Sequence, residues 1–331
     1  MAYSRRRFLA TAPAVLFPSF AAAGSLETET REAPAQSLLL PENQIFKGKE
    51  RFAAIVGKAG KEEWSKLPIG QRIIHVAKEL RGVPYVSFTL EVDDHIESPS
   101  VNLDGVDCWS FFEQCLGFAR MIAYEKPNYT PVDLIRQIEL TRYRGGRCTG
   151  NYLERIHYLA EWFFDNDARG TCRHLTPSLP GAERISGRKI SEMTTLWKSY
   201  RYLRNNPELR GPMKESEEEV ASLPVYQIPK AKVAAIEPQL QSGDVIGIAT
   251  KYNGGFCSHV GLAIRTEDGV LRFMHASSSK KYRRVVIDDS LSGYLNQISA
   301  HSGILVGRPL EVSETVTDPA IYAANLKKLL S

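Results

Sequence analysis

The chain has 331 residues, of which 43% are hydrophobic and 24% are charged. These values are typical of a globular protein and exclude a disordered chain, a collagen and a disulfide-dense mini-protein. The formal net charge of +4 is too small to indicate nucleic-acid binding. No apolar stretch of about 20 residues follows the N-terminus, which argues against a polytopic membrane protein.

The first 23 residues have the order of features found in an export signal. A basic cluster, Arg5–Arg7, precedes an apolar run, Ala10–Phe20, and the small residues Ala21–Ala23 follow. This order indicates a cleaved signal peptide. The segment Ser4–Leu9 is similar to a twin-arginine signal, which carries folded proteins across a bacterial inner membrane. We therefore expect a periplasmic or otherwise exported protein; the alternative is a basic N-terminus that is never cleaved.

The segments before residue 107 alternate between predicted loops and one helical stretch. Residues 24–48 are polar and contain two prolines, so we expect a flexible leader. Apolar residues recur at helical spacing within residues 49–80, and the sequence Arg81–Tyr85 ends that helical stretch. Residues 86–92 alternate as a strand would, and residues 93–106 have the composition of an acidic loop.

A cysteine opens the next predicted helix. Apolar residues recur every three or four positions from Cys108 to Ile122, and Asp107 is a favoured N-cap. A thiol in a first helical turn lies near unpaired N–H groups and the positive end of the helix dipole, which favours a low thiol pKa. Cys108 is therefore a candidate nucleophile, whereas Cys115 fits a buried structural thiol. Burial alone is the alternative explanation for Cys108.

The remaining chain divides into a helical insert and a sheet. Residues 124–225 are mostly helical, with helices expected over 152–166 and 191–205. Short apolar segments with tight turns between them then predict an antiparallel sheet. We expect one α+β domain over residues 49–311 and a helical C-terminal tail over residues 312–331. The predicted strands cover residues 245–249, 259–264, 270–275, 283–287 and 303–310.

Two histidines lie on neighbouring predicted strands. His259, Gly261 and Ala263 share one strand face, where the two small residues leave space beside the imidazole. His275 ends the adjacent strand. A thiolate nucleophile requires a base, and a third polar group that orients the base completes a triad. The alternative is that both histidines are ordinary polar strand residues.

The other cysteines allow several arrangements. The chain has five cysteines, an odd number that leaves at least one thiol unpaired. A Cys148–Cys172 disulfide is plausible in an oxidising compartment. A zinc site formed by these two cysteines with His157 and His174 is less favoured, because the spacings match no zinc motif. We expect no metal and no cofactor.

The order of these motifs resembles a known superfamily. Gly82–Tyr85, Asp107–Cys108, Gly243–Asp244, His259–Gly261 and His275–Ser277 follow one another as they do in the NlpC-type branch of papain-like cysteine peptidases, which cut bacterial cell-wall peptides. Within that superfamily, Arg155–Tyr158 with Trp162–Phe163 resembles the N-acetylmuramoyl-L-alanine amidase-like family. The resemblance covers most of residues 65–310.

The resemblance implies a papain-like fold in which the nucleophile helix packs on an antiparallel sheet. Cys108 would be the nucleophile, His259 the base and His275 the orienting group. Tyr85 and the backbone N–H of Cys108 would assist the oxyanion. Two features depart from the family pattern: Trp109 replaces the usual serine, and the insert is unusually long. We expect Trp109, Arg155, His157, Tyr158 and Arg283 to contact substrate.

The implied function is an exported cysteine hydrolase that cleaves an amide bond in peptidoglycan or muropeptides through a thioester. The bond is either the lactyl–L-alanine amide or one within the stem peptide. The alternative is an inactive peptidoglycan-binding module. Acyl transfer to lipid is disfavoured because Cys108 precedes His259, and a zinc amidase because no paired-histidine spacing appears. We expect no nucleic-acid partner and no membrane span in the mature protein; the oligomeric state stays open.

Overall fold

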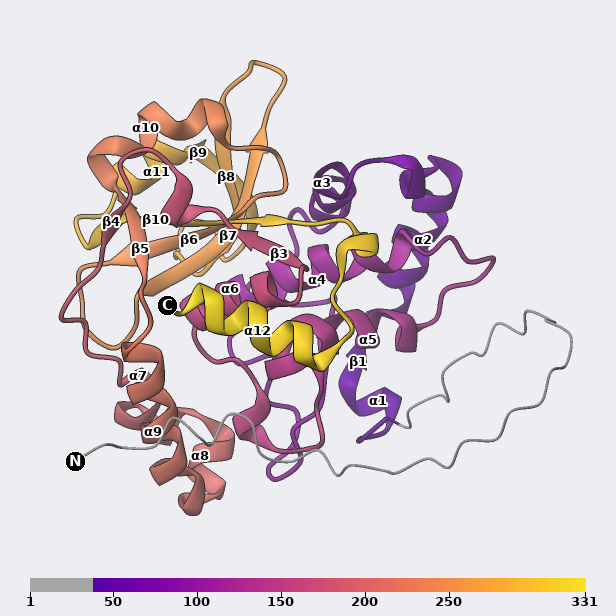
Figure 1. Ribbon diagram of the computed structural model, residues 1–331. Helices are drawn as coiled ribbons and strands as arrows, with labels where there is room; N and C mark the ends of the chain where they lie inside the picture. The colour runs from indigo at the N-terminus through magenta and orange to yellow at the C-terminus, as the bar shows by residue number, and fades with distance from the viewer. Residues whose placement is uncertain (1–37) are drawn as a thin grey trace, which may run out of the picture. The chain divides into compact units, whose positions relative to one another are not determined.

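The computed structural model describes residues 38–331, which form one compact unit. The predicted signal peptide and residues 24–37 of the predicted leader lie outside the described residues. Figure 1 shows a sheet with helices beside it. This arrangement confirms the predicted α+β class.

An antiparallel sheet forms the C-terminal part of the unit. Its strands have the order β4-β5-β10-β6-β7-β8-β9, and every neighbouring pair is antiparallel. The five predicted strands are all present, with ends shifted by a few residues. They are β6 (Val245–Thr250), β7 (Cys257–Arg265), β8 (Leu271–Ser277), β9 (Arg284–Ser290) and β10 (His301–Pro309).

Both faces of the sheet are covered by apolar side chains. Val260, Leu262 and Met274 belong to the core cluster that includes the first helices. Ala263 and Phe273 belong to a second cluster, on the side of α10 (Val233–Ile236) and α11 (Leu291–Asn296). Alternate residues of a strand point to opposite faces, so the two clusters follow directly from the alternation along β7 and β8.

The helix α4 (Cys108–Ile122) lies against one sheet face. It contacts β7 and β8 on one side and α3 (Ile69–Glu79) and α5 (Pro131–Arg142) on the other. Figure 1 shows this helix between the sheet and the other N-terminal helices. Its apolar residues from Phe111 to Ile122 are all buried, as the predicted stripe requires.

The segment before α4 differs from the sequence prediction in two places. The predicted flexible leader extends to residue 48, but Ile45 and Phe46 are buried. Phe46–Lys47 (β1) pairs in parallel with Val101–Asn102 (β2). The predicted strand over 86–92 is wrong, because residues 87–90 form a turn and the others have no regular structure. The apolar side chains of Val86 and Phe88 face solvent there and do not build a strand face. The neighbouring helices are α1 (Glu42–Ile45) and α2 (Lys49–Lys61).

The insert is helical but broken. The helix predicted over 152–166 begins later, as α6 (Leu159–Ala168), after a 3₁₀ turn at Tyr152–Glu154. The helix predicted over 191–205 is two short helices with a 3₁₀ turn between them. Three short strands within the insert or directly after it join the large sheet. They are too short to show an alternating sequence pattern. These elements are α7 (Glu192–Thr195), α8 (Arg201–Asn205), α9 (Arg210–Ala221), β3 (Cys172–His174), β4 (Glu183–Arg184) and β5 (Tyr226–Pro229).

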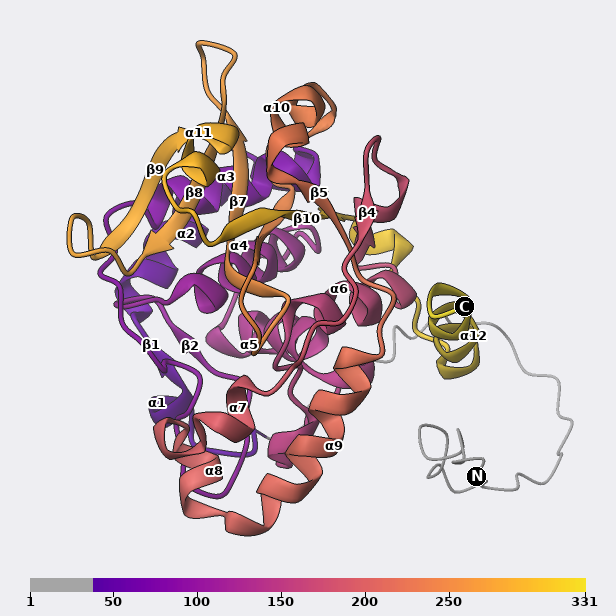
Figure 2. The same cartoon turned by 90° about the vertical axis from the view of Figure 1, so that its left-hand side faces the viewer.

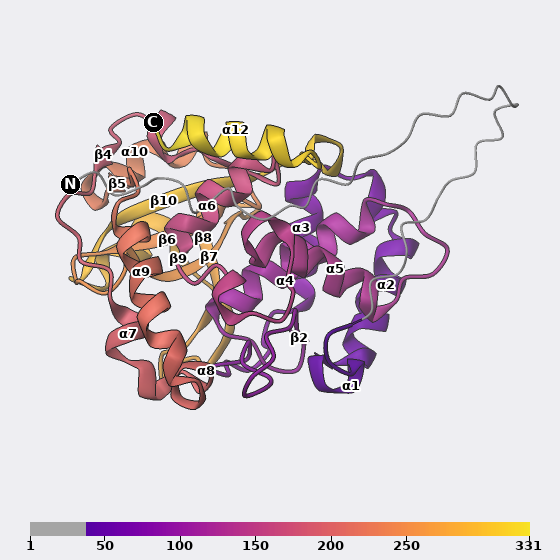
Figure 3. The same cartoon turned by 60° about the horizontal axis from the view of Figure 1, so that its bottom comes forward.

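Two peripheral groups of helices complete the unit. Helices α7, α8 and α9 gather at one end of the sheet, as Figure 2 shows. The C-terminal helix α12 (Pro319–Leu329) contacts α6 and runs along the surface in Figure 3. Among residues 38–331, no helix is long and apolar enough to cross a membrane.

Candidate active site

A capping box fixes the first turn of α4. The Asp107 carboxylate accepts a hydrogen bond from the Ser110 N–H at 2.7 Å, and the Ser110 hydroxyl accepts one from the Asp107 N–H at 3.0 Å. The hydroxyl of Thr89 lies 3.3 Å from the Asp107 carboxylate. These reciprocal bonds satisfy backbone donors that a helix start leaves unpaired. They hold Cys108 at the first helical position.

The thiol of Cys108 lies beside the end of the β7–β8 pairing. β7 pairs with β8 only from Leu262 onward, whereas His275 and the residues after it pair with β9. The part of β7 before Leu262 therefore lacks a partner on its β8 side. The backbone N–H of Val260 interacts with the Cys108 sulfur, next to His259.

The environment of the Cys108 sulfur favours the neutral thiol. Burial and, to a smaller extent, the carboxylate of Asp107 raise its pKa to about 12. The N–H groups of Val260, Cys108 and Trp109 act in the opposite direction but do not prevail. The predicted depressed pKa is therefore wrong for the resting site. The sequence shows the helix N-terminus, which lowers a thiol pKa, but not the enclosure of the sulfur.

His259 and His275 form a direct pair. The Nε2 atom of His259 lies 2.7 Å from the Nδ1 atom of His275, and the two rings are nearly perpendicular. Burial lowers the pKa of His259 well below its usual value, and the charges of His275 and His301 lower it further. His259 is thus a neutral imidazole, the form that accepts a proton.

Two residues beside the histidine pair were not predicted. Asp288 on β9 places a carboxylate oxygen 3.5 Å from Nε2 of His275. Tyr294 on α11 packs its ring 5.1 Å from that of His275, and its pKa is raised by burial and by nearby groups that include Cys108. Neither position shows a motif. The β8–β9 register, which sequence alone does not give, brings Asp288 to the site, and the packing of α11 brings Tyr294.

Tyr85 borders the thiol from the N-terminal side. Its backbone N–H donates to the Arg283 carbonyl at 2.9 Å, which joins the Gly82–Tyr85 turn to β9. Burial raises the pKa of the Tyr85 phenol, and the neighbouring Cys108 and Asp107 raise it further. The structure therefore brings together Cys108, Tyr85, His259 and His275.

The predicted substrate-contacting residues have varied surroundings. Trp109 packs edge-on against Phe112, with 5.7 Å between ring centroids, and Arg283 has an exposed side chain. The other three are engaged inside the protein. Arg155 is buried and pairs with Glu91 and Glu97, His157 contacts the Tyr152 carbonyl, and the Tyr158 hydroxyl donates to Glu217. No contact joins these three to the Cys108 thiol, and their substrate role stays a prediction.

The remaining cysteines do not pair. All five thiols are free, and Cys148 and Cys172 form no disulfide. The Cys148 thiol donates to the Glu97 carbonyl, and Cys172 is fully buried in β3. Within residues 38–331, no three His, Cys, Asp or Glu side chains are grouped to hold a metal ion. The described structure therefore does not assemble the zinc arrangement considered from the sequence.

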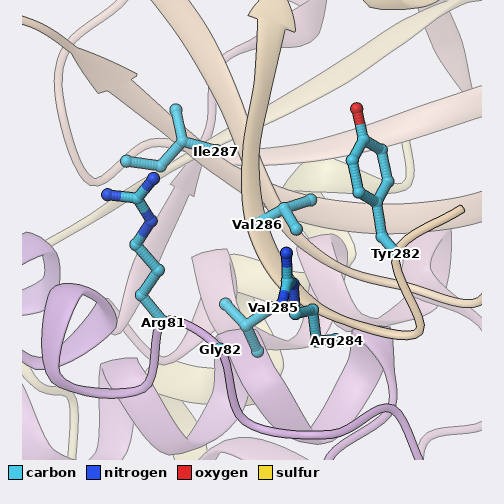
Figure 4. A pocket seen from close by; sticks show the side chains of 7 residues that line it. All are labelled: Arg81, Gly82, Tyr282, Arg284, Val285, Val286 and Ile287. Carbon is cyan, nitrogen blue, oxygen red and sulfur yellow. The ribbon is translucent and has the colours of Figure 1, made fainter.

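A cavity of about 430 Å³ lies along β9, beside the Gly82–Tyr85 turn. Figure 4 shows the side chains of Arg81, Arg284 and Tyr282 around it. Neither arginine forms an ion pair with any acidic side chain of residues 38–331. Val286, which also lines the cavity, is the register partner of His275. The cavity is therefore one strand away from the histidine pair.

Comparison with known proteins identifies relatives of most of the chain. The model of the N-acetylmuramoyl-L-alanine amidase-like family matches residues 75–304. A crystal structure of an N-acetylmuramoyl-L-alanine amidase from Bacteroides uniformis is 31% identical, with a TM-score of 0.65 over 73% of this chain and 99% of that chain. A search of the curated proteins gave no match.

Two further solved structures are similar. A Bacteroides fragilis protein described as a candidate xylanase is 32% identical, with a TM-score of 0.61 over 70% of this chain and 98% of that chain. A Legionella pneumophila protein has a TM-score of 0.60 over 79% of this chain and 95% of that chain. It is 20% identical, so it shows a shared fold alone.

Proposed function

The chain belongs to the N-acetylmuramoyl-L-alanine amidase-like family, and from that premise we propose that it hydrolyses an amide bond of peptidoglycan or muropeptides with Cys108 as nucleophile. His259 acts as the base, and His275 orients it. The observation that carries the proposal is the placement of the Cys108 sulfur at the Val260 N–H, beside the 2.7 Å His259–His275 pair. A thiol, a base and an orienting group are the parts that acyl transfer requires.

The resting protonation states define the first step. Cys108 is a neutral thiol and His259 a neutral imidazole, so His259 takes the thiol proton as the sulfur attacks the carbonyl carbon. The oxyanion that forms lies near the N–H of Cys108 at the start of α4, and the Tyr85 hydroxyl is a second donor. One oxyanion donor contributes about 3–4 kcal/mol to transition-state stability.

The second half of the reaction uses the same groups. The imidazolium of His259 gives its proton to the leaving amine as the carbon–nitrogen bond breaks, which leaves a thioester on Cys108. Water then attacks the thioester while His259 accepts a proton from it. The carbon–sulfur bond then breaks, the acid product leaves, and the His259 imidazolium returns its proton to the sulfur, which restores the neutral thiol.

The cavity along β9 supports an anionic substrate. Stem peptides carry carboxylates, and a guanidinium binds a carboxylate through two parallel hydrogen bonds. Arg81 and Arg284 offer two such groups in one cavity, and Arg283 adds a third on the same strand end. We assign the peptide part of the substrate to this side of the site. Export through the N-terminal signal belongs to the same proposal, because peptidoglycan lies outside the inner membrane.

Digestion of purified muropeptides tests the function. Wild-type protein should release new termini that mass spectrometry identifies: an intact stem peptide indicates the lactyl–L-alanine amide, and a dipeptide indicates cleavage within the stem. Cys108→Ala should abolish turnover, whereas Cys257→Ala, a control at another partly exposed thiol, should retain it. Turnover by Cys108→Ala at the wild-type rate would overturn the mechanism. Wild-type protein that binds muropeptides but does not cleave them would favour the inactive binding module.

A further inference from the structure

Asp288 lies next to His275, on the side of the histidine pair away from His259. Its carboxylate lies 3.5 Å from Nε2 of His275, and its side chain is only 10% exposed. The Nε2 atom of His275 is buried and has no hydrogen-bond partner, and His275 itself is 2% exposed. A buried imidazole nitrogen that faces a carboxylate is a strong position for a charge-assisted contact.

The order of protons along the histidine pair depends on which nitrogen of His275 is protonated. A neutral imidazole holds one proton, on either Nδ1 or Nε2. If Nε2–H of His275 points to Asp288, its Nδ1 is an acceptor, and the proton between the two rings belongs to Nε2 of His259. Nδ1 of His259 is then unprotonated, and it is the remaining nitrogen that can take the Cys108 proton.

We propose that Asp288 is a positioning residue that fixes this order of protons, so that the site is a line of four groups: Asp288, His275, His259 and Cys108. The proposal rests on the function proposed above. Asp288 does not touch the reacting atoms. When His259 accepts the thiol proton, the carboxylate of Asp288 stabilises, through His275, the positive charge that develops on the pair, as the third member of a triad does.

Other charged and titratable groups lie around these four groups and can also affect the pH dependence of the reaction. Lys281 lies near Asp288, His301 on β10 acts on His259, and Tyr294 on α11 packs on both histidines. None of them forms a hydrogen bond or an ion pair with Nε2 of His275. Asp288 is the acidic group that does so among the described residues.

Replacement of one carboxylate by an amide tests the proposal. Asp288→Asn keeps the size of the side chain and removes its charge. We expect kcat to fall about tenfold to a hundredfold and KM to change less than twofold. The loss in kcat should not exceed the rate enhancement of about 10²–10⁴ that a general base itself supplies. The acidic limb of the kcat/KM profile should move to lower pH, because the imidazolium loses a stabilising charge. Asp288→Glu should recover part of the activity.

The neighbouring residue gives a matched control. Asp289 is exposed and follows Asp288 on the same strand, so Asp289→Asn removes the same charge without reaching His275. It should leave kcat and the pH profile unchanged. Equal profiles for wild type, Asp288→Asn and Asp289→Asn would overturn the proposal. A reduced kcat with an unmoved acidic limb would also overturn it, because it would indicate a structural role alone.

A second measurement needs no substrate. The rate at which iodoacetamide alkylates Cys108 at pH 7, followed by peptide mass spectrometry, reports proton transfer from the thiol to His259. Asp288→Asn should slow it several-fold, and Asp289→Asn should not. Slowed alkylation in a protein that cleaves no muropeptide would support the proton order and reject the proposed function. Unchanged alkylation would overturn the role of Asp288 even if muropeptides are cleaved.

Discussion

Gly261 lies directly against His275: a Cβ atom at Gly261 would lie 2.8 Å from the Cβ of His275 and 2.6 Å from the Met274 carbonyl oxygen. Real Cβ atoms do not approach other atoms this closely, so residue 261 has no room for a side chain. The glycine lets β8 pass this close to β7, which keeps His275 within reach of His259. Close packing of this kind tolerates little added volume.

Gly261→Ala should therefore displace β8 and lengthen the His259–His275 contact. We expect a loss of about 1–3 kcal/mol in the free energy of unfolding, together with reduced hydrolysis. Gly57→Ala is the control, because nothing lies within 4 Å of that position in α2, and alanine favours a helix by up to about 1 kcal/mol. Denaturant unfolding and muropeptide turnover measure both effects. Wild-type activity in Gly261→Ala would contradict the packing argument.

Asp107 has opposing effects on the site. Its side chain caps α4, but its charge raises the pKa of the Cys108 thiol. Asparagine caps a helix as well as aspartate does, so Asp107→Asn should keep the helix and make the thiol more acidic. Alkylation of Cys108 at pH 8 should be about threefold to tenfold faster, the scale expected when one nearby charge is removed. An unchanged or slower rate would show that the Asp107 charge does not act on the thiol.

A buried ion pair joins α4 to the insert. Arg142 of α5 donates to the Glu113 carboxylate of α4 at 2.8 Å, and both side chains are fully buried. Removing one partner leaves an uncompensated buried charge, which costs about 3–5 kcal/mol. Arg142→Met should therefore lower the free energy of unfolding by that amount in denaturant titrations.

An exposed pair provides the comparison for Arg142→Met. Lys58 and Glu79 pair on the surface, with side chains 42% and 32% exposed, so Glu79→Gln should cost at most about 1 kcal/mol. Equal losses for Arg142→Met and Glu79→Gln would mean that burial of the Arg142–Glu113 pair has no energetic consequence.

His174 makes stability depend on pH. It is 7% exposed, stacks on Phe163, and burial lowers its pKa to about 4. The unfolded chain takes up a proton near pH 6.5 and the folded chain only near pH 4. Stability is therefore complete above pH 6.5 and declines as the pH falls between these values. Between pH 7 and pH 4.5, the free energy of unfolding should therefore fall by about 2–3 kcal/mol less in His174→Phe than in the wild type. An identical loss in both proteins would contradict this assignment.

The site could be predicted from the sequence where a motif carries it. Asp107 and Cys108 show a cap followed by an apolar stripe, and His259 lies on a strand with clear alternation. Asp288 and Tyr294 could not be found in this way, because the β8–β9 register and the placement of α11 bring them to His275. The pKa of Cys108 could not be predicted either, since a sequence shows the helix start and not the enclosure of the sulfur.

In the fold, too, some elements could be predicted from local sequence patterns and others could not. The five strands from β6 to β10 have enough apolar alternation to be predicted. The turns between consecutive strands account for the pairing of β6 with β7, β7 with β8 and β8 with β9. The pairing of β10 with β6 joins strands that are distant in sequence, and no local pattern predicts it. The segment 86–92 alternates equally well, yet Val86 and Phe88 point to solvent, so local pattern was overridden by tertiary context. The helix predicted over 152–166 begins only at Leu159, and its Trp162 packs edge-on against Phe112 of the Cys108–Ile122 helix, a contact that the local sequence pattern does not show.

The most direct test of the account is to trap the acyl group on Cys108. Wild-type protein mixed with muropeptide and quenched in acid during turnover should carry an added mass on the peptide that contains Cys108. The mass of an N-acetylmuramoyl group would identify the lactyl–L-alanine amide, and that of a peptidyl group a bond within the stem. Active protein that carries no adduct at any quench time, with Cys108→Ala still turning over substrate, would contradict Cys108 as the nucleophile.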